Sequence, residues 1–167
     1  MMSGARDGLV REWTCDTCGE TVSDPARALV VWQAGHAGED GPSLYREFRI
    51  VHKTFLGEPD PRDCDPGNEG GFTHSLELDN FLGADGLTRL LSFLSAGPLI
   101  GPGRSRIAPE DLDGYVDLVR RLQVPGYERA RPRFGDESTL DWLSDANEIA
   151  PYTTDMLGRI ADGRLSR

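Results

Sequence analysis

The sequence predicts an α+β protein in which a β-hairpin module precedes and packs on a C-terminal bundle of helices. Short runs rich in β-branched residues concentrate in the first half of the chain, which favours strands there. Apolar residues at helical spacing concentrate in the second half. We therefore expect a β-rich module over residues 1–77 and an α-helical region over residues 78–167.

Two strands are expected in the module. The first is the apolar run Ala28–Trp32, which is bounded by Pro25 and Gly35. The second is Tyr45–His52, in which Phe48, Ile50 and His52 should share one face because side chains alternate along a strand. The stretch between the two strands should form a long hairpin loop. The later stretch LGEPDPRDCDPGNEGG should also be a loop, since it is rich in proline and glycine.

Helices are expected from about residue 84 onward. The first carries an apolar stripe at helical spacing, made of Leu87, Leu90, Leu91 and Leu94. Pro109 suits the first position of a second helix, with acidic residues behind it. Ser138 has the form of a capping box with Asp141 and should open a short helix. Pro151 should open the last helix, and Gly163 should end it.

Composition limits the classes of function. The chain has 18 basic and 28 acidic residues, so its formal net charge is −10. This balance disfavours tight binding to nucleic acid, which depends on Lys and Arg displacing counterions from phosphates. No apolar run is long enough to span a membrane, and the N-terminus lacks the apolar core of a secretion signal. We therefore expect a cytoplasmic protein.

Three cysteines carry the clearest chemistry: Cys15, Cys18 and Cys64. They cannot all pair within one chain, and stable disulfides are rare in the cytoplasm. Zinc takes four tetrahedral ligands from thiolate and imidazole. The spacing of Cys15 and Cys18 lets two thiolates reach one ion, and Gly19 permits the tight turn that follows. Cys64 supplies a third thiolate.

The fourth ligand should be a histidine. The chain offers His36, His52 and His74. His52 is favoured because it ends a strand on the face of Phe48 and Ile50, where an unpaired imidazole would be costly. His74 is the second choice, and His36 lies in a glycine-rich segment that should face solvent. The expected zinc ligands are therefore Cys15, Cys18, His52 and Cys64.

The stretch TCDTCGE resembles the zinc knuckle of treble-clef and zinc-ribbon modules, in which a CxxCG turn is followed by a β-hairpin. The resemblance covers about residues 13–65 and implies a structural zinc ion. Treble clefs usually supply their second pair of ligands close together from the start of a helix. Here His52 and Cys64 are separated by eleven residues, and Cys64 lies among prolines.

Other roles for the cysteines are less well supported. A thioredoxin-like CxxC should open a helix, but Gly19–Val22 has no helical pattern. The thiols could also be buried without a metal. A catalytic zinc would keep one position open for water, and neither HExxH nor the His-x-Glu of zinc deaminases occurs. Four protein ligands instead make a closed, structural site.

No phosphate-binding loop, nucleophile elbow or other catalytic set occurs, so we favour a non-enzymatic role without catalytic or cofactor-binding residues. The leading hypothesis is a zinc protein, of the small bacterial type, that binds another protein as an interaction or regulatory module. The alternative is a nucleic-acid-binding regulator that uses the segment Arg120–Arg133. That segment holds five arginines, Arg120, Arg121, Arg129, Arg131 and Arg133. We favour instead that they pair with the acidic residues that interleave with them, which are Asp111, Asp117, Glu128 and Asp136.

Overall fold

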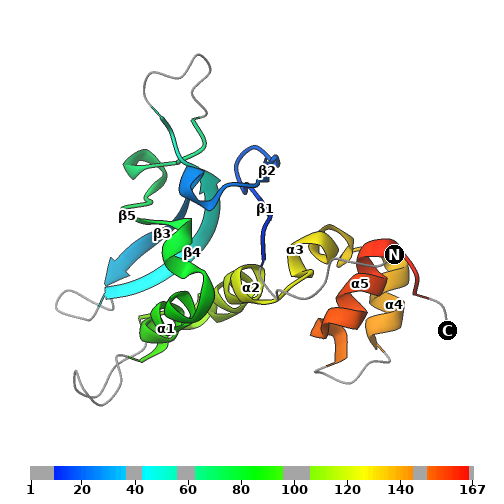
Figure 1. Cartoon of the computed structure of the whole chain (residues 1–167). Coiled ribbons are helices and arrows are strands. Elements are labelled where there is room, and N and C mark those ends of the chain that lie inside the picture. Colours follow the sequence, from blue (N-terminus) through cyan, green and yellow to red (C-terminus); the bar gives the residue numbers. More distant parts are fainter. Residues whose placement is uncertain (1–9, 37–42, 56–62, 96–105, 145–149, 166–167) are drawn as a thin grey trace. The chain divides into compact units, whose positions relative to one another are not determined.

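The computed structural model describes residues 10–36, 43–55, 63–95, 106–144 and 150–165. It confirms a mixed α+β protein, with antiparallel sheets in the N-terminal part and α-helices mostly in the C-terminal part (Figure 1). The chain forms two compact units. One spans Arg11–Leu122 and the other contains Gln123–Arg167. Helices α1 and α2 belong by contact to the first unit together with the sheets, and the expected domain limit at residue 77 stays a prediction.

The first unit contains two antiparallel sheets. A two-stranded sheet pairs β1 (Trp13–Thr14) with β2 (Thr21–Val22). A three-stranded sheet has the order β4-β3-β5, made of β3 (Ala28–His36), β4 (Ser43–His52) and β5 (His74–Glu77). The two expected strands are thus present and longer than expected, whereas β1, β2 and β5 were missed because they have only two to four residues. The tip of the β3–β4 hairpin lies outside the described residues.

Strand β4 contains a β-bulge a few residues before His52. The pairing of β3 with β4 shifts between Val31 and Gln33, and Glu47 has the left-handed φ of 56°. The backbone N–H of Glu47 donates to the Asp111 carboxylate at 2.7 Å. Burial raises the pKa of that carboxyl group. Beyond the bulge the register of β4 with β3 is regular from Arg49 to His52, and Ile50, Val51 and His52 are all buried.

Five α-helices occur in the described residues: α1 (Gly83–Leu94), α2 (Leu112–Gln123), α3 (Tyr127–Ala130), α4 (Glu137–Ser144) and α5 (Thr154–Asp162). Pro109 opens a 3-10 turn before α2, and Gly163 caps α5 with a left-handed φ of 66°, both close to expectation. The capping-box prediction at Ser138 was wrong, because α4 begins one residue earlier, at Glu137. No helix of the described segments is both long and apolar enough to cross a bilayer.

Aromatic side chains make up much of the core of the first unit. Trp32 lies at the centre, with its ring 5.4 Å from that of Phe93 and 6.2 Å from that of Phe48. Phe48 also meets Tyr115 of α2 at 5.2 Å. The Trp32–Phe93 and Phe48–Tyr115 contacts are edge-to-face, and aromatic contacts of this kind add to the free energy gained by burying the rings. The sheet, α1 and α2 therefore share one core.

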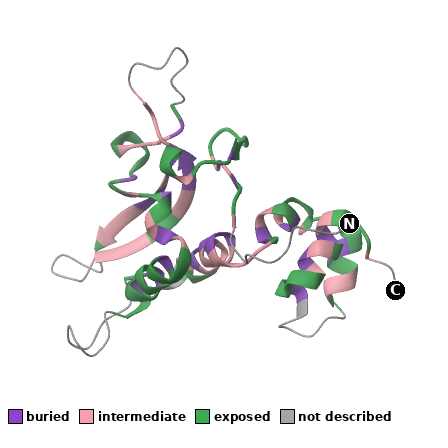
Figure 2. Ribbon diagram, in the orientation of Figure 1, coloured by how far each residue is buried: buried purple, intermediate pink, exposed green. Residues whose placement is uncertain are grey.

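Helix α1 buries a different face from the one that the leucine spacing suggested. Leu90 and Phe93 are buried, whereas Leu87, Leu91 and Leu94 are 41%, 55% and 38% exposed. Figure 2 accordingly colours much of α1 as exposed. The aromatic core selects Phe93, and the rest of the leucine stripe is left at the surface.

The second unit has a small core of its own. Tyr127 and Ala130 of α3 pack with Leu157 and Ile160 of α5, and all four are buried. The ring of Phe134 meets that of Tyr127 at 5.2 Å. These contacts hold the short helix α3 in place, which could not be stable alone.

Gly86 in α1 should tolerate no side chain. A Cβ atom there would lie 2.0 Å from the backbone carbonyl carbon of Phe81, so the chain would have to move. We expect Gly86→Ala to lower the free energy of unfolding by roughly 2–3 kcal/mol. Gly158→Ala is the matched control, because the same atom in α5 meets nothing within 4 Å. It should raise stability by about 0.5–1 kcal/mol. Urea denaturation measures both, and equal stability of Gly86→Ala and the parent would contradict this packing.

Candidate metal centre

The turn between β1 and β2 positions two cysteines. The backbone N–H of Cys15 donates to the carbonyl of Glu20 at 2.9 Å, which closes the hairpin. The N–H of Gly19 donates to the carbonyl of Cys15, also at 2.9 Å, and Gly19 has a φ of 75°. This left-handed conformation is the tight bend that the sequence predicted for Gly19. We call the turn Cys15–Gly19 the knuckle. In it Cys15 is buried and Cys18 is exposed.

His52 approaches the knuckle from the sheet. It is the last residue of β4, pairs with Ala28 of β3 and is 8% exposed. Its position follows from the alternation that also buries Ile50. The imidazole therefore comes from the end of β4, at a residue that is paired with β3.

Cys64 reaches the same place from the proline-rich segment. Its side chain is 5% exposed. The hydroxyl of Thr17, in the knuckle, donates to the carbonyl of Cys64 at 2.7 Å. This bond holds together two segments that are 47 residues apart in the sequence.

The four expected ligands converge. The three sulfur atoms and one ring nitrogen of Cys15, Cys18, His52 and Cys64 all lie within 4.8 Å of one another. The Nδ1 atom of His52 lies 3.4 Å from the sulfur of Cys18 and 3.8 Å from that of Cys64. A tetrahedral ion with metal–sulfur bonds of about 2.3 Å and a metal–nitrogen bond of about 2.0 Å would separate such a pair by about 3.5 Å. The arrangement fits a metal ion bound through Nδ1.

The thiols influence one another strongly. Burial raises the pKa of Cys64 to about 12, and its contacts with Cys18 and Cys15 and the charge on Cys15 add to the effect. Burial acts in the same direction on Cys15, but hydrogen bonds from the backbone of Cys18, Thr17 and His52 and from the Cys18 thiol lower the pKa of Cys15 overall. Three thiolates this close repel one another. A divalent cation between them would remove that repulsion.

The other two histidines lie elsewhere. His74, the second choice from the sequence, is on β5, where its ring stacks on Trp32 at 5.8 Å and its Nδ1 lies 2.9 Å from the hydroxyl of Thr73. His36 is exposed at the end of β3. Neither belongs to the cluster of ligand atoms found in the described residues. Of the three histidines, the structure brings His52 to the cysteines.

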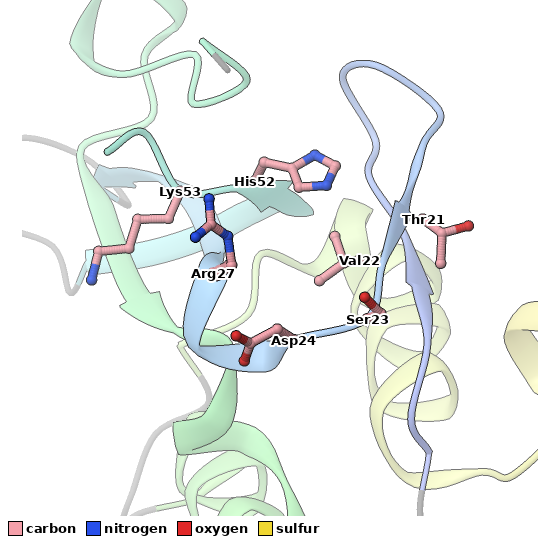
Figure 3. A pocket seen from close by; sticks show the side chains of 7 residues that line it. All are labelled: Thr21, Val22, Ser23, Asp24, Arg27, His52 and Lys53. Atoms are coloured by element: carbon pink, nitrogen blue, oxygen red, sulfur yellow. The ribbon is translucent and has the colours of Figure 1, made fainter. Parts of the chain in front are cut away.

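A small pocket adjoins the cluster on the side of β2. Its volume is about 210 Å³, and His52 forms part of its wall (Figure 3). The pocket is lined by Thr21, Val22, Ser23, Asp24, Arg27, His52 and Lys53. Its charged groups have neighbours of their own: Asp24 accepts from the backbone of Ala26 at 3.0 Å, and Lys53 pairs with Glu77 at 2.5 Å. The pocket itself therefore indicates no particular ligand.

Sequence reasoning missed two residues that support the knuckle. Asp16, between the first two cysteines, pairs with Arg121 of α2 at 2.6 Å. Arg121 is 2% exposed and pairs with Asp16, which was not among the acidic partners expected for it. One signal was present: Arg121 follows Leu118 by three residues and so borders the buried face of its helix. Its partner, 105 residues away, could not be inferred.

Comparisons with known proteins give no match: no protein-family model, curated protein or solved structure is similar to this chain.

The histidines provide a direct test of the ligand set. We expect His52→Ala to lose zinc during dialysis against a competing chelator, because an imidazole ligand is removed. His36→Ala and His74→Ala are matched controls and should each keep one zinc ion per chain. The measurement is the zinc-to-protein ratio by elemental analysis. Zinc loss in either control, or retention in His52→Ala, would show that another residue completes the site.

Proposed function

We propose that the protein binds one structural zinc ion through Cys15, Cys18, His52 and Cys64. The observation that carries this proposal is the convergence of their four ligand atoms within 4.8 Å. Three thiols and one imidazole are a donor set that suits zinc, whereas magnesium and calcium take oxygen ligands. The set is also one of the usual combinations in structural zinc sites.

The structural role follows from the number of ligands. Four protein ligands fill a tetrahedral shell, so no position is left for the water that a catalytic zinc ion activates. The ion would join the knuckle, the end of β4 and the segment around Cys64. Structural zinc ions contribute on the order of 10 kcal/mol of apparent binding energy, which is comparable to the total stability of a small domain. The metal would thus decide whether these segments fold together.

A non-enzymatic role as a protein-interaction or regulatory module fits this site best, and we propose it as the function that the zinc ion supports. Two observations favour a protein as the partner. The net charge of −10 disfavours nucleic acid. Leu87, Leu91 and Leu94 lie exposed on one side of α1, and exposed apolar surface of this kind is typical of protein contacts.

The alternative, a nucleic-acid contact through Arg120–Arg133, finds less support. Arg121 is buried in its ion pair with Asp16. Arg129 pairs with Asp162 at 3.5 Å, and Arg133 pairs with Asp136 at 3.7 Å, one of the acidic residues expected to neutralise the segment. Much of the positive charge of this segment is thus balanced by carboxylates, which reduces its attraction for phosphates.

Cys18→Ser tests whether the fold depends on the metal. Cys18 is exposed, so the exchange of sulfur for oxygen changes little packing. We expect the variant to lose several kcal/mol of unfolding free energy in zinc-containing buffer, because a thiolate ligand is removed. With excess EDTA the variant and the parent should melt at the same temperature. A parent-like melting temperature of Cys18→Ser with zinc present would contradict a structural metal.

A salt titration separates a protein partner from a nucleic acid. We expect no binding to duplex DNA or to single-stranded RNA at 0.1 M salt in a fluorescence-anisotropy titration. Binding that falls steeply with salt, and that disappears in an Arg129→Ala/Arg131→Ala/Arg133→Ala variant, would overturn the proposed preference for a protein.

A further inference from the structure

A buried arginine in α2 holds the knuckle from both sides of Cys15. The Nη1 atom of Arg121 donates to the Asp16 carboxylate at 2.6 Å, and Nη2 donates to the Thr14 carbonyl at 2.8 Å. Thr14 and Asp16 directly precede and follow Cys15. A guanidinium group with 2% exposure is costly to bury unless it is paired in good geometry. Arg121 can occupy this position only while the knuckle is formed.

Asp16 extends the same connection to the strand that carries His52. Its Oδ2 atom, which accepts from Arg121, also accepts from the backbone N–H of Ile50 at 2.7 Å. The backbone N–H of Asp16 donates in turn to the Ile50 carbonyl at 2.8 Å. Ile50 lies two residues before His52 in β4. One carboxylate thus ties Cys15 to the strand of the imidazole ligand and to α2.

Thr17 provides a further hydrogen bond between the knuckle and a segment that carries a ligand. Its hydroxyl donates to the carbonyl of Cys64 at 2.7 Å, so the second residue between Cys15 and Cys18 fixes the knuckle to the third thiol. Both intervening residues therefore hold the knuckle to a segment that supplies another ligand. This is the role that outer hydrogen bonds play in metal sites, where they orient the ligands and are needed for full affinity.

The N-terminal end of helix α2 also has a hydrogen bond to β4. Asp111, just before the helix, accepts from the backbone N–H of Glu47 in the bulge at 2.7 Å. The hydroxyl of Tyr115 donates to the Leu90 carbonyl of α1. These contacts fix the position of α2. The two N–H groups of Arg121 that bond Asp16 and Thr14 therefore face the knuckle in one orientation.

We infer that Asp16, Thr17 and Arg121 are positioning residues for the metal centre, and that the Asp16–Arg121 ion pair couples occupation of the centre to the C-terminal turn of α2. The inference rests on the proposed zinc site. A metal ion that binds the formed knuckle favours the conformation that accepts Arg121. By thermodynamic reciprocity, a docked Arg121 raises the affinity for the metal. Binding of a divalent cation such as zinc is thus linked to the conformation of the C-terminal turn of α2.

The test compares zinc affinity in conservative variants by competition with a chromophoric chelator. Asp16→Asn keeps an oxygen that can accept from Ile50 but removes the charge that faces Arg121. Thr17→Val removes the hydroxyl at similar volume. We expect each to bind zinc about 10–100-fold more weakly than the parent. Thr17→Ser, which retains the hydroxyl, should bind within about twofold of the parent.

Two further measurements separate positioning from general destabilisation. The cobalt-substituted variants should keep the parent absorption spectrum, because all four ligands remain. Hydrogen exchange of the zinc-loaded protein should be faster at the end of α2 in Asp16→Asn than in the parent. The control Arg129→Met/Asp162→Asn removes an exposed ion pair, with Arg129 67% exposed, and should leave zinc affinity unchanged.

Arg121→Met is the stronger variant and should also weaken zinc binding. If it fails to fold, Asp16→Asn and Thr17→Val still test the inference, since neither changes a residue of α2. Zinc affinities of both variants within twofold of the parent would overturn the inference. A parent that binds no zinc would instead refute the proposed function, so the two failures can be told apart.

Discussion

The fold around the cysteines depends on one electrostatic constraint. Three thiols and an imidazole are held within 4.8 Å of one another, and two of the thiols are buried. Such a group is stable when the thiols stay protonated or when a cation neutralises the thiolates. A bound metal ion converts mutual repulsion into attraction to a common centre. The knuckle, the end of β4 and the Cys64 segment then stabilise one another.

Arg121 extends the influence of this constraint beyond the ligands. Because its guanidinium group is buried against Thr14 and Asp16, the C-terminal turn of α2 depends on the conformation of the knuckle. The same helix contributes Tyr115 to the aromatic core around Trp32 and Phe93. We therefore expect the proposed metal site, the sheet and helix α2 to behave as one cooperative unit. Binding or loss of the metal should alter the conformation of the C-terminal turn of α2. This link is a physical route by which a structural ion could serve a regulatory role.

Local patterns were sufficient to predict the ligand cluster and the two long strands. The spacing of Cys15 and Cys18 requires a turn, and the alternation that ends at His52 places its ring with Ile50. The matched donor set of three thiols and one imidazole then pointed to Cys64. The turn and the strand position could be predicted because each depends on neighbouring residues, whereas Cys64 was chosen only because it completes the donor set. The division of the chain at residue 77 and the identity of the metal stay predictions.

Long-range packing explains what the sequence could not reveal. The leucine spacing of α1 predicts one buried stripe, but Leu90 and Phe93, whose ring meets that of Trp32, are buried while Leu91 stays exposed. Arg121 looked like one member of a surface cluster, because its partner is 105 residues away. Strand β5 has four residues, too few for a periodic signal. Each of these features involves a contact between segments that are far apart in the sequence.

X-ray absorption spectroscopy at the zinc edge, on protein purified without added metal, tests the central claim most directly. It reports the identity of the metal and the atoms bound to it in one experiment. We expect a zinc edge and a first shell of three sulfur atoms at about 2.3 Å and one nitrogen atom at about 2.0–2.1 Å. The absence of a zinc edge, or a shell containing a water oxygen and fewer than three sulfur atoms, would contradict a closed structural site.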